Sequence, residues 1–197
     1  DVCDGNLTAA IVVTNPVDTN TPGVYTVRYN VSDAAGNTAQ AMRTVTVQDT
    51  QAPALTRLGA ATVTIECKET YTDAGATATD ACDGDLTADI ATENPVDTNV
   101  PGAYEVTYNV ADAAGNTAAA LTRTVTVRDT QAPVIALSGA AAVTIECGSD
   151  YTDAGATATD ACAGNMTTRI AVTNPVSVNA PGVYTVRYNV MDDAGNA

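Results

Sequence analysis

The sequence predicts an all-β fold made of consecutive β-sandwiches of about 80 residues each. Three observations favour it: segments rich in Val and Thr alternate apolar and polar residues, Gly- and Pro-containing turns separate them, and the same blocks recur along the chain. No segment carries the 3.6-residue period of an amphipathic helix.

The recurring blocks define an internal repeat. Thr50–Asn116 and Thr130–Asn196 are identical at 43 of 67 positions, at an offset of 80 residues. The first residues match the later part of the same unit, because Asp33–Asn37 correspond to Asp112–Asn116 at an offset of 79. We therefore predict the C-terminal part of one repeat at 1–49, a complete repeat at 50–129, and a repeat lacking its last strand at 130–197. On this interpretation, the chain is a window onto a longer array.

Two segments of the complete repeat have the period-two pattern of half-buried strands. In Thr62–Cys67, Val63, Ile65 and Cys67 share one face while Thr and Glu share the other. In Gly102–Val110, the residues expected to face inward are Tyr104, Val106, Tyr108 and Val110.

A hairpin is predicted after the second of these strands. Asp112–Asn116 interrupts the alternation, and Gly115 suits the positive φ that follows a type I turn. Leu121–Val127 then returns as the partner strand. Arg123 shares the apolar face of this segment, so we expect it near a strand end, where its guanidinium can reach water.

A family resemblance rests on several of these motifs. Pro101-Gly102-Ala103-Tyr104 places a Tyr at the start of a late strand, as in a tyrosine corner, and the placement recurs at Tyr25 and Tyr184. Together with TVTIEC, YTDAGATATDACDGDLT and the YxVxYxxxDxAGN ending, it resembles the tandem Ig-like domains of bacterial surface proteins and is similar to the hyalin repeat. The resemblance covers the whole chain. It implies immunoglobulin-like sandwiches arranged end to end that serve as spacers and adhesion modules, and it specifies no ligand.

The five cysteines follow the repeat. Cys67 and Cys82 are 15 residues apart, as are Cys147 and Cys162, and Cys3 corresponds to Cys82. Because the chain has no His, disulfides are favoured over zinc. We therefore predict a disulfide within each repeat, joining Cys67 to Cys82 and Cys147 to Cys162, with a partner for Cys3 upstream. Free buried cysteines are the alternative.

Two acidic features are candidate calcium sites. Asp49 and Asp129 lie in the linkers between repeats, where an acidic residue of the next repeat would have to join them. Asp80, Asp83 and Asp85 surround Gly84 in the complete repeat, although the third repeat has Ala163 in place of Asp83. Turn formation alone would also explain these residues. Asp33, Asp112 and Asp192 belong to the predicted hairpins, which explain them without a ligand role.

Composition excludes several functional classes. The net charge is −15, which opposes binding to nucleic acid, and no apolar run is long enough to span a bilayer. Without His, a nucleophile in a recognisable setting or a phosphate-binding loop, we expect no enzyme activity.

We therefore expect an extracellular or cell-surface extender, part of a stalk or fibre, whose partners are neighbouring repeats and, through self-association, other arrays. The alternative is an adhesin repeat that binds a glycan or protein, with calcium as a cofactor of that binding.

Overall fold

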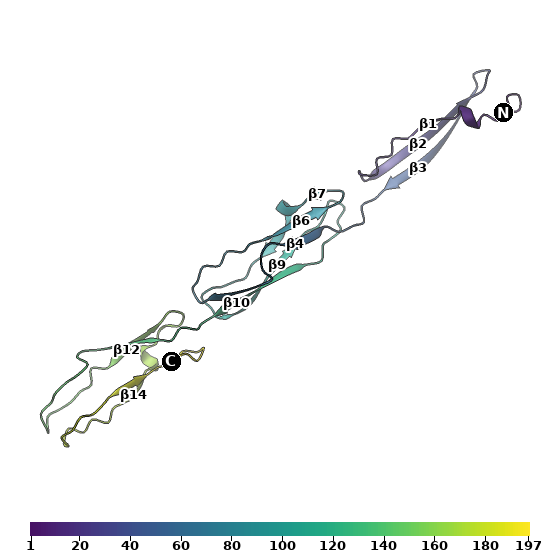
Figure 1. The fold of residues 1–197 in the computed structure, drawn as a ribbon. Coiled ribbons are helices and arrows are strands. Elements are labelled where there is room, and N and C mark those ends of the chain that lie inside the picture. The colour runs from purple at the N-terminus through teal and green to yellow at the C-terminus, as the bar shows by residue number, and fades with distance from the viewer. The chain divides into compact units, whose positions relative to one another are not determined.

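A computed structural model describes all 197 residues, and it contains strands, turns and three short 3-10 helices (Figure 1). The complete repeat forms a four-stranded sheet in the order β5-β10-β9-β8 and a three-stranded sheet in the order β4-β6-β7. Its strands are β4 (Ala54–Arg57), β5 (Thr62–Glu66), β6 (Ala76–Asp80), β7 (Gly84–Asp85), β8 (Ala91–Glu93), β9 (Gly102–Asn109) and β10 (Leu121–Arg128). The predicted all-β fold is confirmed.

The apolar residues of the alternating segments form the core of this repeat. Val106 and Tyr108 on β9 and Val125 on β10 are fully buried, whereas the residues between them are more exposed. Strand β5 pairs in parallel with β10, Val63 lying opposite Val125 and Ile65 opposite Val127. This pairing brings the end of β5 beside the end of β10, where the chain leaves the repeat.

The flanking repeats contain corresponding elements. The first has one antiparallel sheet, β1-β2-β3, and the third has a three-stranded sheet, β11-β12-β13, and a separate pair, β14-β15. Their bounds are β1 (Val12–Thr14), β2 (Gly23–Ser32), β3 (Thr38–Val47), β11 (Val134–Leu137), β12 (Ala156–Asp160), β13 (Gly164–Asn165), β14 (Ala171–Thr173) and β15 (Arg187–Asn189). The 3-10 helices are Thr8–Ala10, Thr87–Asp89 and Thr167–Arg169, each far shorter and less apolar than a membrane-crossing helix.

Contacts divide the chain into two compact units whose limits fall within the complete repeat. One unit comprises Asp1–Leu58, Gly75–Thr92 and Tyr108–Leu121, and the other comprises Gly59–Ala74, Glu93–Thr107 and Thr122–Ala197. Each unit therefore contains one linker together with residues from the repeats on both sides of it. The repeat boundaries at 49/50 and 129/130 stay a prediction from the sequence.

The predicted corner and hairpin are both present. The hydroxyl of Tyr104 donates a hydrogen bond to the carbonyl of Val100 at 2.8 Å, and Tyr25 and Tyr184 each bond in the same way to the carbonyl four residues upstream. In the hairpin, Gly115 has a φ of 90°, a conformation that an L side chain adopts only with strain. The Asn116 amide donates to Asp112 Oδ1 at 2.7 Å and closes the turn.

The position predicted for Arg123 is wrong. Arg123 is only 2% exposed, and its Nη1 lies 2.7 Å from Oδ1 of Asp73. A buried guanidinium is stable only when its charge is paired, and Asp73 supplies the opposite charge from a loop 50 residues away in the sequence. Since the partner comes from a distant segment, strand periodicity alone did not reveal it.

Candidate functional site: the junction between repeats

The disulfide connects two consecutive repeats. Cys67 is bonded to Cys162 across 95 residues of sequence, so the predicted pairings of Cys67 with Cys82 and of Cys147 with Cys162 are wrong. Cys67 directly follows β5, and its amide donates to the carbonyl of Arg128, the last residue of β10. The stretch from Cys67 to Cys82 contains strand β6, whose extended backbone leads the chain away from Cys67, whereas Cys162 lies two residues after β12 of the next repeat.

Three cysteines form no disulfide, although they lie at positions equivalent to those of the bonded pair. They are Cys3, Cys82 and Cys147. Cys147 corresponds to Cys67, while Cys3 and Cys82 correspond to Cys162. Each of these three cysteines therefore aligns with one of the two residues that form the disulfide between the second and third repeats.

A carboxylate next to the bridge fastens the linker to the preceding repeat. Glu66, the last residue of β5, accepts hydrogen bonds from the amide of Thr130 at 2.8 Å and from its hydroxyl at 3.0 Å. Both donors belong to the linker that leads into the third repeat. The sequence pattern had assigned Glu66 only to the polar face of its strand, and nothing local distinguishes it from other exposed strand residues.

Three carboxylates converge at the same junction. Asp129 follows β10, Asp160 ends β12, and Asp192 opens the last hairpin. One ligand atom from each lies within 4.8 Å of the others. Asp160 and Asp192 are 7% and 4% exposed, whereas Asp129 is half-buried.

Hydrogen bonds satisfy part of this group. Asp192 accepts bonds from the amide and side-chain nitrogen of Asn196, and that side chain also donates to the Asp129 carbonyl. Oδ1 of Asp160 accepts the amides of Cys162 and Ala163, both at 2.7 Å. Oδ2 of Asp160 is buried and has no hydrogen-bond partner.

The pKa values of two of these carboxyl groups shift in opposite directions. Desolvation, followed by the charges of Asp160, Asp192 and Glu66, raises the pKa of Asp129, against a backbone hydrogen bond from Gln131. For Asp192, desolvation by itself raises the pKa, but the hydrogen bonds from Asn196 outweigh it and the net pKa is lowered.

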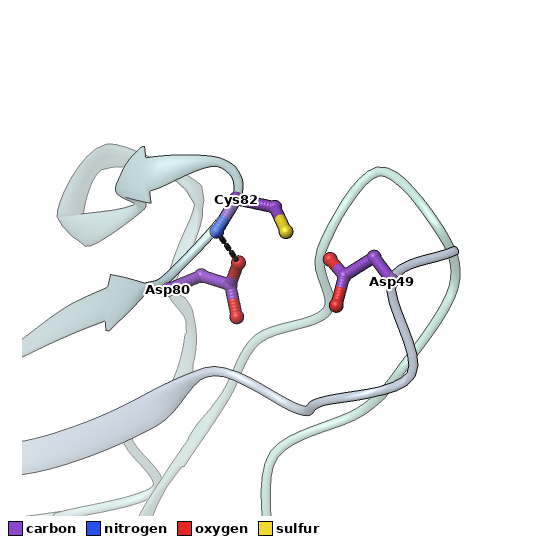
Figure 2. A group of neighbouring side chains, drawn as sticks. All are labelled: Asp49, Asp80 and Cys82. Atoms are coloured by element: carbon purple, nitrogen blue, oxygen red, sulfur yellow. Dashed lines mark hydrogen bonds between the residues drawn. The ribbon is translucent and has the colours of Figure 1, made fainter. Parts of the chain in front are cut away.

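The preceding junction has a related acidic group. Figure 2 shows the carboxylates of Asp49 and Asp80 close to the thiol of Cys82, whose amide donates to Asp80 Oδ1 at 2.7 Å. Asp49 also lies within ligand distance of Asp83 and Asp112. The linker and loop residues that the sequence suggested as separate sites therefore meet at one place.

Two local differences separate the junctions. Asp83 accepts the amide of Ala113 through its side chain, a contact that Ala163 is unable to make at the corresponding position. Cys82 is a thiol whose pKa is raised by desolvation and by the charges of Asp49 and Asp80, whereas Cys162 forms the disulfide.

Prediction and structure differ for three acidic residues. Asp85 is in neither acidic group, and its side chain accepts the amide of Thr87 at 2.9 Å. Asp112 and Asp192, to which the sequence assigned only a hairpin role, belong to the groups while also closing their hairpins. Their equivalent placement in successive repeats was visible in the sequence, but their proximity to the linker Asp depends on the fold.

Comparison with known sequences agrees with the repeat. The model of a family described as "Bacterial surface protein, Ig-like domain" matches residues 1–47, 55–127 and 135–197. The chain is 31% identical over its full length to an uncharacterized 81.3 kDa protein of Acholeplasma phage L2, and 31% identical over 99% of its length to pesticidal crystal protein Cry22Aa of Bacillus thuringiensis. It spans only 28% and 27% of those two relatives.

Solved structures give more distant similarity. The lipoprotein BT2262 of Bacteroides thetaiotaomicron aligns with 41% of this chain and 39% of its own, at 29% identity and a TM-score of 0.37. A Clostridium perfringens ZmpB structure containing the M60 catalytic domain and two CBM51 domains aligns with 93% of this chain and 33% of its own, at 14% identity and a TM-score of 0.35.

Proposed function

Because the chain belongs to the family of Ig-like domains of bacterial surface proteins, we propose that it is a segment of an extracellular extender whose consecutive repeats are joined covalently. The Cys67–Cys162 disulfide carries the proposal. Domains connected only by a linker tend to move relative to one another, because their interfaces are small and polar. A disulfide between successive domains prevents them from separating, and such a bond persists in an oxidising compartment outside the cell.

Two further features support the same role. Glu66 binds Thr130 of the linker through two hydrogen bonds, which limits the freedom of the chain where it leaves the repeat. Pro133 follows within the same linker, and its ring restricts the backbone further. A junction restrained by a disulfide, a carboxylate and a Pro suits an element that transmits force along its length.

Extension of single molecules under force tests the proposal. With the disulfide intact, the segment that joins Cys67 to Cys162, which are 95 positions apart in the sequence, is unable to extend after the repeats unfold. Reduction should release this segment and add roughly 310 to 340 Å to the unfolded length, at about 3.3–3.6 Å per residue. Cys67→Ser should show the longer extension without reductant, and Cys147→Ser, which removes an unbridged cysteine, should behave like the unchanged chain.

An unfolded length that does not depend on reductant would contradict covalent joining of the repeats. Ligand binding by an adhesin repeat stays a separate prediction. A glycan array probed with the chain would test it, and selective binding would add a recognition role that a pure spacer does not have.

A further inference from the structure

We propose that Asp129, Asp160 and Asp192 form a calcium site that ties the linker to the third repeat. This inference does not rest on the proposed extender function, because it depends only on the chemistry of the acidic group. Each carboxylate comes from a different segment: the linker after β10, the end of β12 and the final hairpin.

The spacing of the carboxylates fits a shared cation. Calcium binds oxygen at about 2.3–2.6 Å, so two ligand atoms on opposite sides of one ion lie about 4.6–5.2 Å apart. The ligand atoms of the three Asp residues are within 4.8 Å of one another. Three carboxylates supply up to six oxygens, and calcium commonly completes its six to eight ligands with carbonyls and water.

A buried oxygen without a partner gives the independent reason to expect a cation. Asp160 is 7% exposed, and its Oδ1 accepts two backbone amides while its Oδ2 accepts none. An ionised carboxylate oxygen taken out of water without a partner is costly. The two ion pairs of the structure, Arg123–Asp73 and Arg169–Asp193, supply no cation to this group.

Hydrogen bonds hold the carboxylates of the site in place before a metal binds. Asn196 holds the Asp192 carboxylate through two hydrogen bonds and also fixes the linker by donating to the Asp129 carbonyl at 3.2 Å. Such bonds orient metal-ligating carboxylates and set their geometry before binding. The group at the preceding junction also has a buried oxygen without a partner, there on Asp49.

Calorimetric titration of the 197-residue chain with Ca²⁺ tests the site. We expect Asp160→Asn to reduce the number of sites by one, or to weaken binding at this junction by at least about tenfold, since calcium affinity depends on the number of charged ligands. Asp150→Asn is the matched control, because it removes the same charge from an exposed residue of the third repeat outside the group.

Two results would overturn the proposal: no binding by the unchanged chain at millimolar Ca²⁺, or a titration of Asp160→Asn that coincides with that of Asp150→Asn. Circular dichroism should verify that each variant folds. If Asp160→Asn does not fold, Asp129→Asn takes its place, since Asp129 lies in the linker and is only half-buried. A force-extension result at the disulfide leaves this test unaffected, so the two proposals fail independently.

Discussion

Arg123 and Asp73 form an ion pair in the complete repeat, with Nη1 of Arg123 2.7 Å from Oδ1 of Asp73 and the Arg side chain 2% exposed. The chain also contains a pair of the same chemistry at the surface, Arg169–Asp193, whose side chains are 42% and 88% exposed. The two pairs allow the effect of burial to be measured within one molecule.

Removing the buried partner should destabilise the fold strongly. Asp73→Asn leaves the Arg123 charge buried with a neutral partner, and breaking a buried pair in this way costs about 3–5 kcal/mol. Asp193→Asn should change stability by less than about 1 kcal/mol, because the exposed pair is screened by water. Urea unfolding midpoints compare the two variants, and equal shifts would show that burial of Arg123 does not decide its contribution.

Loss of the Glu66 carboxylate should loosen the linker. Glu66→Ala removes both acceptors of Thr130, so the Thr130 amide should exchange with solvent faster and protease should cleave the linker sooner. Hydrogen exchange and timed proteolysis measure these effects. Glu146→Ala provides the control at the corresponding position of the third repeat, and equal exchange at Thr130 in both variants would contradict a restraint by Glu66.

The Tyr188–Asp153 hydrogen bond should make stability depend on pH at both extremes. The bond from the Tyr188 hydroxyl lowers the pKa of Asp153, and it raises the pKa of Tyr188 to about 12. Asp153 therefore stabilises the fold above its unfolded pKa of about 3.9, and this is lost as the pH falls through the lower folded pKa. Tyr188 contributes fully below about pH 10, and this is lost as the pH rises through about 12.

Tyr188→Phe should accordingly lower the thermal unfolding midpoint most between about pH 4 and pH 10, with a smaller difference beyond either limit. Tyr184→Phe is the control, because Tyr184 donates to the Ala180 carbonyl, which does not titrate. Ultraviolet absorbance should also show one tyrosine ionising near pH 12 that is absent from Tyr188→Phe. If Tyr188 ionises at the same pH as Tyr184, the hydrogen bond to Asp153 is contradicted.

The disulfide between consecutive repeats should recur at each junction of a longer array. In a chain made of three consecutive copies of residues 50–129, we expect Cys67 of each copy to bond to Cys82 of the next, because Cys82 corresponds to Cys162. Peptide mapping without reductant should find two bridges and two thiols, one in each terminal copy. Disulfides between Cys67 and Cys82 of the same copy would contradict this prediction and support the pairing expected from sequence spacing.

The sequence predicted much of the fold because its signals are local. Period-two alternation identified β5 and β9, whose inward residues Val106 and Tyr108 are buried, and the residues around Gly115 identified the hairpin. The placement of Tyr104 after a Pro-Gly turn predicted a corner whose hydroxyl bonds to the backbone four residues upstream. Each of these features depends on neighbours within a few residues along the chain.

The junction was less predictable because its contacts join distant segments. The 15-residue spacing favoured Cys82 as the partner of Cys67, but the fold places Cys162 of the next repeat there. Asp112 and Asp192 have a sufficient local role in their hairpins, which concealed their proximity to Asp49 and Asp129. Asp85, in contrast, is adjacent in sequence to the acidic loop but outside both groups.

The repeat, the all-β class and the inward faces of the main strands follow from the amino-acid sequence, since periodicity and turn chemistry are properties of short segments. The partner of Cys67, the carboxylates beside Asp129 and the counter-charge of Arg123 depend on the folded arrangement of distant segments. Strands bring the ends of such segments to the same place, and neither spacing nor residue type specifies which ends will meet.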